Sequence, residues 1–238
     1  VVRRPETGLD EDPCFSTFVS HILDFLVKTK YHLCLDVART VKSQLNVYDE
    51  LLRTRRVDGL ILVESVARDE RIRKLEADKF PFVLIGKFAD SGRQSSGVLC
   101  VDNDNVLAGR LATNHLVQSG YKKIAFLGGP KGVTVSEDRI EGYLEAVTKH
   151  QAKPIVVHSE FGYEPARRTA TELLSSADRP DALVVLDDFM AMGAVRAAHN
   201  NNISIPKDLG GVGCNDSVRC GLVAEVDARG GAEPPGEV

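Results

Sequence analysis

The sequence predicts an α/β fold of two similar lobes, each built on a doubly wound parallel sheet. Short runs of almost exclusively apolar residues recur along the chain, and a stretch with helical periodicity follows each of them. Strands without polar alternation are buried on both faces, and strands that alternate with helices form parallel sheets through right-handed crossovers. An internal echo indicates two copies of one plan, because the run that begins at Arg56 (RVDGLILV) resembles the run that begins at Arg179 (RPDALVVL).

Eight apolar runs are the predicted strands of these sheets. In chain order they are residues 31–37, 60–63, 82–85, 98–101, 124–127, 155–157, 183–186 and 209–212. We expect residues 1–121 to form an N-terminal lobe and residues 122–216 a C-terminal lobe.

The first two helices follow from capping and periodicity. Asp12 followed by Pro13 is typical of an N-cap with proline at the first helical position. The helix that begins there places Phe18, Ile22, Phe25 and Leu26 on one face, which is explained either by core packing or by a homodimer contact. A second amphipathic stripe covers residues 45–52.

Two further helices flank the expected lobe boundary. One is predicted over residues 104–119, with Leu111 and Leu116 inward and Gly120 as its C-terminal stop. The other is predicted to begin at Ser136, because acidic residues follow it and the positive N-terminal end of the helix dipole stabilises negative charge.

Composition and charge exclude several classes of protein. The 43% hydrophobic and 27% charged residues are typical of a globular protein, and no run approaches the roughly 20 apolar residues that a membrane helix needs. A net charge of −4 argues against a grip on a nucleic-acid backbone by this chain itself. Five widely spaced cysteines without a Cys-x-x-Cys pair favour reduced thiols, and residues 1–5 show no secretory signal.

The last residues depart from the pattern. Residues 217–238 lack the rhythm of strand and helix and end rich in Gly, Pro and Ala. A linker, a disordered end and a reading-frame error all explain such a tail.

Enzyme and metal signatures are absent from the sequence. It contains no dinucleotide-binding, P-loop, zinc-protease or nucleophile-elbow motif, and its six histidines are scattered singly, so we expect no catalytic residues, no metal and no cofactor. Residues 128–132 form a glycine-rich stretch after a predicted strand. This stretch is either an anion cradle or a plain strand-to-helix loop.

Polar and aromatic residues follow most of the predicted strands. Ligands of open α/β sheets bind at the carboxyl ends of the strands, and carboxylates, amides, arginine and an aromatic face suit a polyol. Strand-end aspartates also serve as helix caps, so each has two interpretations. The candidates are Asp36, Glu64, Ser65, Gly86, Lys87, Asp102, Glu160, Phe161, Asp187, Asp188, Asn215 and Asp216.

Seven segments, in order, resemble the lactose-repressor (LacI/GalR) family of transcriptional regulators, whose sensor domain is similar to periplasmic sugar-binding proteins. They are VDGLIL from Val57, PFVLIG from Pro81, VDN from Val101, GYKKIAFLGG from Gly120, Ser136-x-x-Arg139-x-x-Gly142-Tyr143, DDFMAMG from Asp187 and IPKDLGGVGCND from Ile205. The resemblance implies a periplasmic-binding-protein-like sensor that closes on an effector in an interlobe cleft.

By this resemblance the effector-binding residues are Phe15, Ser16, Asp102, Arg139, Phe161, Asp187 and Asn215. Arg139 would clamp hydroxyl groups and Phe161 would stack on a sugar ring. An ion pair with Asp138 or Glu137 is the other interpretation of Arg139. A neutral mono- or disaccharide is the expected effector, whereas a phosphorylated sugar would need a further cation such as Lys87.

The resemblance also implies which partners the protein has, and it shows where the sequence differs from the family pattern. A family member is a cytoplasmic homodimer that binds operator DNA through an N-terminal helix-turn-helix headpiece, and this chain begins near the end of the first strand of the sensor. The family continues past Asp216 to finish both sheets, and residues 217–238 do not match that continuation, so the fold is expected to be incomplete there.

Two other classes remain open. The alternative is a periplasmic-type sugar-binding protein of a transporter, which a signal peptide upstream would favour. An α/β enzyme that acts on sugars or nucleotides would need a paired acid and base in the cleft.

Overall fold

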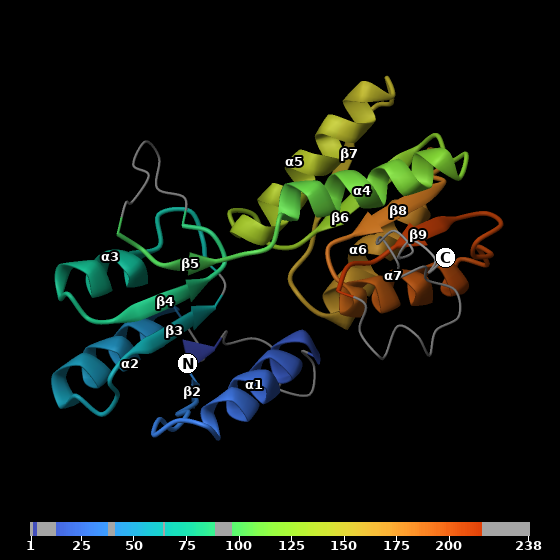
Figure 1. The fold of residues 1–238 in the computed structure, drawn as a ribbon. Helices are drawn as coiled ribbons and strands as arrows, with labels where there is room; N and C mark the ends of the chain where they lie inside the picture. The colour runs from blue at the N-terminus through green and yellow to red at the C-terminus, as the bar shows by residue number, and fades with distance from the viewer. Residues whose placement is uncertain (1, 4–12, 38–40, 64, 89–96, 216–238) are drawn as a thin grey trace, which may run out of the picture. The chain divides into compact units, whose positions relative to one another are not determined.

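The structure is a computed structural model that describes residues 2–3, 13–37, 41–63, 65–88 and 97–215. These residues form two compact units (Figure 1). Unit 1 comprises Val1–Asn103 and Gly132–Val135, and unit 2 comprises Asp104–Lys131 and Ser136–Val238. The predicted tail at residues 217–238 lies outside the described residues.

Unit 1 is built on a parallel sheet. Within the described residues its strand order is β2-β1-β3-β4-β5, and β3 and β4 pair in register from Leu60 with Phe82 to Val63 with Ile85. The strands are β1 (Val2–Arg3), β2 (Asp36–Val37), β3 (Leu60–Val63), β4 (Phe82–Ile85) and β5 (Cys100–Val101), and the helices are α1 (Pro13–Leu26), α2 (Val41–Thr54) and α3 (Glu70–Ala77).

The core of unit 1 lies on both faces of its sheet. Tyr48 of α2 and Ile72 of α3 pack with Leu62 and Leu84 in one buried cluster. Phe15 of α1 packs against Val63 in a second cluster. The apolar strands are therefore covered by helices on both sides, as the lack of polar alternation predicts.

Unit 2 is built on a second parallel sheet. Within the described residues its order is β7-β6-β8-β9, and all pairs are parallel. The strands are β6 (Ile124–Gly128), β7 (Ile155–His158), β8 (Ala182–Val185) and β9 (Gly210–Val212), and the helices are α4 (Asn105–Gln118), α5 (Thr134–Lys149), α6 (Tyr163–Leu174) and α7 (Asp188–Asn200).

Helices cover both faces of this sheet as well. Ala125, Leu127 and Leu183 pack against residues of α6 and α7, whereas Phe126 and Val184 pack against residues of α4 and α5. Neighbouring residues of one strand therefore face opposite helix layers, which is the doubly wound arrangement that the sequence predicts.

The two units share one strand order. The second strand of each unit lies outside the first, and the third and fourth lie on the other side of the first. The echoing segments around Arg56 and Arg179 lead into β3 and β8, which hold the third place in both sheets. The internal repeat of the sequence is thus a repeat of topology.

The units divide the chain at a different point from the lobe boundary expected at 121/122. Ala112 and Leu116 of α4 are buried in the cluster of Phe126 and Val184, so α4 belongs to unit 2. Residues 132–135 are grouped with unit 1, because the segment around Val133 pairs with Val66.

Several details of the predicted elements are wrong. Only Asp36–Val37 of the predicted strand 31–37 is a strand, and Tyr31 and Leu35 are exposed. Leu111, expected inward, is 45% exposed, and Phe25, on the apolar face of α1, is 70% exposed.

The helix boundaries agree in part. Helix α1 begins at Pro13 as predicted, and its expected N-cap Asp12 lies outside the described residues. The fourth predicted helix begins two residues earlier than expected, at Thr134, and Ser136 lies inside it. Gly120 follows the C-cap of α4 with φ +94°, a left-handed conformation that favours glycine.

Candidate functional site

The candidate site lies at the carboxyl ends of the strands of unit 2. β6 pairs with β7 on one side and with β8 on the other, so the strand order reverses at β6. Such a switch point is where open α/β sheets bind ligands. Gly129, Leu186 and Gly213 follow three of these strands, and Arg139 of α5 reaches over their ends.

Arg139 is the central polar group of the site. The side chain is 8% exposed, and its Nε donates a hydrogen bond to Oδ1 of Asn105 at 3.0 Å. Its Nη1 donates to the backbone oxygen of Leu186, and its Nη2 lies 3.4 Å from Oδ1 of Asn215. The guanidinium thus bridges α4 and the loops after β8 and β9. That it binds an effector stays a prediction.

Two glycines bring Arg139 to Asn105 by letting α4 and α5 pack closely. A Cβ atom on Gly109 would lie 2.0 Å from the backbone oxygen of Arg139, and one on Gly142 would lie 1.9 Å from that of Val106. Both distances exclude a side chain. The Gly142 of the family-like segment is therefore required by helix packing.

The side chains of Phe161 and Leu186 lie against Gly129 at the end of β6. A Cβ atom on Gly129 would lie 3.1 Å from a ring atom of Phe161 and 2.8 Å from a methyl group of Leu186. The amide of Gly129 donates to Oγ of Ser136 at 3.1 Å. Glycine at 129 thus lets the half-buried ring of Phe161 lie on the backbone, where an aromatic face is available to a sugar ring.

The loops after β8 and β9 are joined by backbone and capping contacts. Asp187 is the N-cap of α7 and accepts from the amide of Met190 at 2.8 Å, which confirms the capping interpretation of this aspartate. A carboxylate has roughly four lone-pair sites, so capping leaves capacity for a ligand. The amide of the buried Asp188 donates to the backbone oxygen of Cys214 at 3.1 Å.

Three charged side chains act on the thiol of Cys214, which directly precedes the predicted ligand Asn215 in the chain. Burial raises the pKa of the Cys214 thiol, the positive charge of Arg139 acts to lower it, and the charges of Asp188 and Asp187 raise it further. The thiol is therefore held in its neutral form within a mixed field of one cation and two carboxylates.

The predicted residues of unit 1 lie in different settings. Phe15 is 7% exposed and belongs to the core beside Val63. Ser16 is exposed, and the exposed Asp102 accepts from the amide of Asn103 at 2.8 Å. That these three residues contact an effector, and that the two lobes enclose it, stays a prediction.

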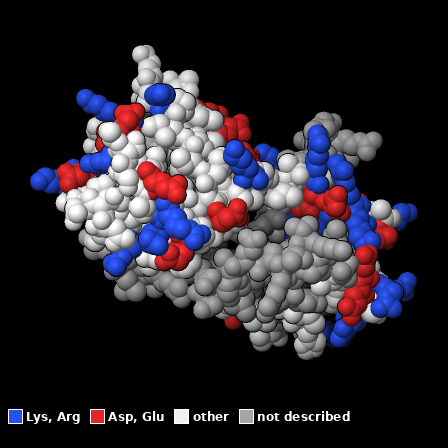
Figure 2. Space-filling view, turned by 180° about the vertical axis from the view of Figure 1, so that it is seen from behind, with Lys and Arg blue, Asp and Glu red and all other residues white. Residues whose placement is uncertain are grey.

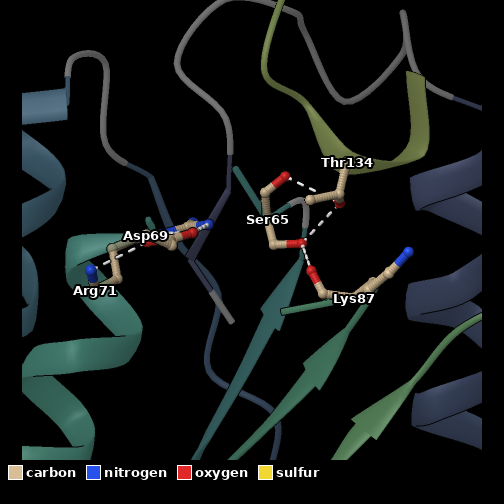
Figure 3. A network of polar contacts seen from close by, with 5 residues as sticks. All are labelled: Ser65, Asp69, Arg71, Lys87 and Thr134. Atoms are coloured by element: carbon tan, nitrogen blue, oxygen red, sulfur yellow. Dashed lines mark hydrogen bonds and ion pairs between the residues drawn. The ribbon is translucent and has the colours of Figure 1, made fainter. Parts of the chain in front are cut away.

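Ser65, a strand-end candidate, has a structural role (Figure 3). It is fully buried, its hydroxyl donates to the backbone oxygen of Lys87 at 2.5 Å, and it lies 2.8 Å from the hydroxyl of Thr134. The amide of Thr134 also donates to the backbone oxygen of Ser65 at 3.1 Å. The side chains of Asp36, Glu64 and Asp216 lie outside the described residues.

Sequence reasoning missed Asn105. It directly follows the N-cap Asp104, which indicates only the start of a helix. Its contact with Arg139 depends on how α4 packs on α5, and the glycine at 109 was the available signal.

The described residues give no sign of a metal site or a membrane helix, and one face of the surface shows no basic patch (Figure 2). In the view of Figure 2, acidic and basic side chains are interspersed over the described surface and do not gather into a basic patch. Among the described residues, no group of three or more His, Cys, Asp or Glu side chains is placed to hold a metal ion. None of the described helices has the length and apolar character needed to cross a bilayer.

Comparisons with known proteins agree on one family. The profile described as periplasmic binding proteins and sugar binding domain of the LacI family matches residues 5–218. The regulator MalR of Streptococcus pneumoniae is 28% identical over 200 residues, which are 82% of this chain and 60% of MalR. The ribose operon repressor of Halalkalibacterium halodurans is 34% identical over 166 residues, which are 70% of this chain and 48% of that protein. The chain thus spans between about half and three fifths of these relatives.

Solved structures of regulators have the same fold. A LacI transcriptional regulator from Bacillus cereus superposes with a TM-score of 0.84 at 28% identity, covering 90% of this chain and 77% of that one. A complex of the regulator CelR with cellobiose gives a TM-score of 0.80 at 25% identity and covers 91% of this chain and 67% of that one. A LacI-family regulator from Enterococcus faecium with bound ribose gives 0.76 at 26% identity and covers 94% and 81%. The chain therefore belongs to the family of periplasmic binding proteins and sugar-binding domains of LacI-type regulators.

Proposed function

We propose that the chain is the effector-binding part of a transcriptional repressor and that it binds a small neutral sugar at the carboxyl ends of the strands of unit 2. One observation carries the proposal. Arg139, almost buried, is held at the strand ends by Asn105, Leu186 and Asn215, and the ring of Phe161 lies against Gly129 at the end of β6.

The chemistry of this arrangement suits a saccharide. Arg139 donates to hydroxyl oxygens, Asp187 accepts from hydroxyl groups, and Asn215 does both. Phe161 offers a flat apolar surface to the C–H face of a sugar ring. The structures of CelR with cellobiose and of the Enterococcus faecium regulator with ribose support a neutral sugar as the class of effector.

Control of transcription is the output of this binding. An effector that prefers one conformation of the sensor shifts its population and thereby the affinity for operator DNA. We assign operator binding to an N-terminal helix-turn-helix headpiece outside this chain, and we propose a cytoplasmic homodimer as the working form. The names of the relatives, which are transcriptional regulators, favour this function over transport and over catalysis.

The experiment is a binding assay with a panel of neutral mono- and disaccharides that includes ribose and cellobiose. Thermal unfolding is followed by calorimetry, because a ligand that binds only the folded state raises the melting temperature. At least one sugar should raise the melting temperature of the wild-type chain, and Arg139→Gln should abolish the rise. Arg168→Gln, which removes an exposed arginine of α6, is the matched control and should keep it.

Two results would overturn the proposal. One is a panel in which no saccharide stabilises the wild-type chain. The other is an Arg139→Gln variant that still binds a sugar with wild-type affinity.

A further inference from the structure

We propose that Asn105 is a positioning residue that fixes the orientation of the Arg139 guanidinium and thereby sets the affinity of the site. This inference rests on the proposed function, because it assigns to Asn105 an action on an effector through Arg139. Asn105 is 3% exposed, and its Oδ1 accepts from Nε of Arg139 at 3.0 Å.

Two hydrogen bonds fix the plane of the Arg139 guanidinium. A guanidinium is planar and carries five N–H donors in a rigid fork. Asn105 takes the Nε donor and the backbone oxygen of Leu186 takes an Nη1 donor. The Nη2 contact with the exposed Asn215, at 3.4 Å, is longer than an ordinary hydrogen bond. The first two contacts therefore direct the Nη2 edge toward the accessible side, where a hydroxyl group competes with only a weak contact.

Asn105 is itself held in place. It is the first residue of α4, and the preceding Asp104 caps the helix by accepting from the amide of Leu107 at 2.8 Å. One turn later Gly109 packs directly on the backbone of Arg139. The distance between the amide oxygen and the guanidinium is therefore set by backbone packing, and little side-chain entropy is lost when a ligand binds.

The chemical type of Asn105 also matters. An amide oxygen accepts from Nε without a formal charge, so it orients the guanidinium and leaves its positive charge uncompensated by this partner. A hydrogen bond to a charged group contributes more than one between neutral groups, so its loss should be measurable in binding.

A second contact between the same helices provides a matched control. Asn114 of α4 lies 3.2 Å, through its Oδ1, from Nε2 of His150 at the end of α5. Asn114→Ala removes an asparagine that joins the same two helices away from the strand ends. A role of Asn105 that is only structural would be reproduced by this control.

The first measurement needs no ligand. Solvent exchange of the Arg139 Nε proton is followed by NMR of the full chain labelled with 15N-arginine, with Arg139→Lys to assign the signal. Asn105→Ala should speed this exchange about tenfold or more, because the proton loses its acceptor. Asn114→Ala should leave the exchange unchanged, and Asn105→Asp, which keeps an acceptor in place, should restore it. Unchanged exchange in Asn105→Ala would overturn the inference whether or not a sugar binds.

The second measurement is affinity for a sugar that stabilises the wild-type chain, with cellobiose and ribose as the first probes. Asn105→Ala should weaken binding about tenfold in the wild-type background and have no further effect beside Arg139→Lys, which keeps a cation but lacks the Nε donor. Additive effects of the two substitutions would show that Asn105 does not act through Arg139. Asn105→Leu, which fills similar space without an acceptor, replaces the alanine variant if that variant does not fold.

The two measurements distinguish a failure of the positioning role of Asn105 from a failure of the proposed function. In one outcome the exchange of the Nε proton is slow and depends on Asn105, but no sugar binds. This outcome would refute the proposed effector and the effect on affinity. It would still establish that Asn105 orients Arg139. Sugar binding that is insensitive to Asn105→Ala would refute the positioning role and leave the proposed function intact.

Discussion

Asp69 and Arg71 form an ion pair whose two side chains are almost fully buried (Figure 3). Nε of Arg71 donates to Asp69 at 2.9 Å and Nη2 at 2.6 Å, and the side chains of Arg71 and Asp69 are 12% and 2% exposed. Burial raises the pKa of the neighbouring Tyr48, while the positive charge of Arg71 acts to lower it. Buried charges are tolerated only when paired, so each partner depends on the other.

Asp69→Ala should therefore lower the free energy of unfolding by about 3–5 kcal/mol, because Arg71 keeps its charge in a buried place and α3 loses its N-cap. Urea unfolding followed by circular dichroism measures the change. Glu164→Ala, which removes an exposed partner of Arg167, is the control and should cost less than about 1 kcal/mol. Equal losses in both variants would contradict this account.

Cys214 should react slowly with iodoacetamide in the folded protein. Burial raises the pKa of its thiol, which lowers the amount of reactive thiolate, and Cys214 is less accessible to the reagent than the exposed Cys34 and Cys100. Arg139→Gln should slow the reaction further, because it removes the charge that lowers this pKa. Alkylation at pH about 8.5, near the ordinary pKa of a free thiol, tests both points when it is timed by peptide mass spectrometry. Faster reaction of Cys214 than of Cys34 would contradict them.

The raised pKa of the Cys214 thiol also makes the stability of the fold depend on pH. Above the ordinary cysteine pKa of about 8.5 the unfolded chain loses the thiol proton while the folded chain keeps it. The unfolded state then binds fewer protons, so the contribution of Cys214 to stability falls as pH rises through this range.

At this scale the sequence predicts residue types better than contacts. Arg139, Asn215 and Asp187 were predicted ligands, and the first two are in contact in the structure while the third lies in the adjacent loop. Phe15 is an expected ligand by the family resemblance alone, and in the structure it lies in a buried cluster beside Val63, because an aromatic residue on an apolar helix face is buried by packing. Asn105 could not be predicted, because a hydrogen bond between two helices depends on their crossing.

At the scale of elements, strands buried on both faces are predicted closely. β3 and β4 match the predicted residues 60–63 and 82–85 without error, because each is an uninterrupted apolar run covered by helices. The run 31–37 is interrupted by His32 and Asp36, and of its residues only Asp36–Val37 are paired in the sheet. A run with polar interruptions therefore predicts a strand less closely, because pairing with a partner strand is not encoded locally.

The close packing of α4 on α5 leads to a prediction about Gly142. Gly142→Ala should lower the free energy of unfolding by about 1–3 kcal/mol, because the added Cβ would lie 1.9 Å from the backbone oxygen of Val106 and the helices must separate. Urea unfolding measures the loss.

Gly211→Ala is the control for this substitution, since an added Cβ there meets no atom within 4 Å. It should have little effect. A stable Gly142→Ala variant that keeps the Arg139–Asn105 hydrogen bond would contradict the role assigned to this glycine.

At the scale of the whole molecule, each unit has its own hydrophobic core. Leu62, Leu75 and Leu84 are fully buried in unit 1, and Phe126 and Leu127 are fully buried in unit 2. The sequence predicts two lobes, but it places α4 in the first, because a helix that follows a strand of one lobe can pack on the next sheet.

A substitution in one core should therefore mainly affect its own unit. Leu84→Ala should destabilise unit 1 by about 2–5 kcal/mol, through lost burial and the cavity left behind. The chain contains no tryptophan, so hydrogen exchange by mass spectrometry is the suitable measurement. Exchange should rise in β3 and β4 and remain slow in β6 and β8, and a uniform rise over both units would contradict separate cores.

The shared strand order bears on how such a protein arises and diversifies. Duplication of one coding segment would yield two sheets of the same order at once, and the similar sequences that lead into β3 and β8 are what such an event would leave. After duplication, residues beyond the strand ends are free to change while each core is retained. In one copy the position after the third strand leads to Ser65, which ties the backbone together, and in the other it leads to Leu186 and Asp187 beside Arg139. New ligand preferences in this lineage can therefore evolve by exchange of a few loop residues, without the invention of a new fold.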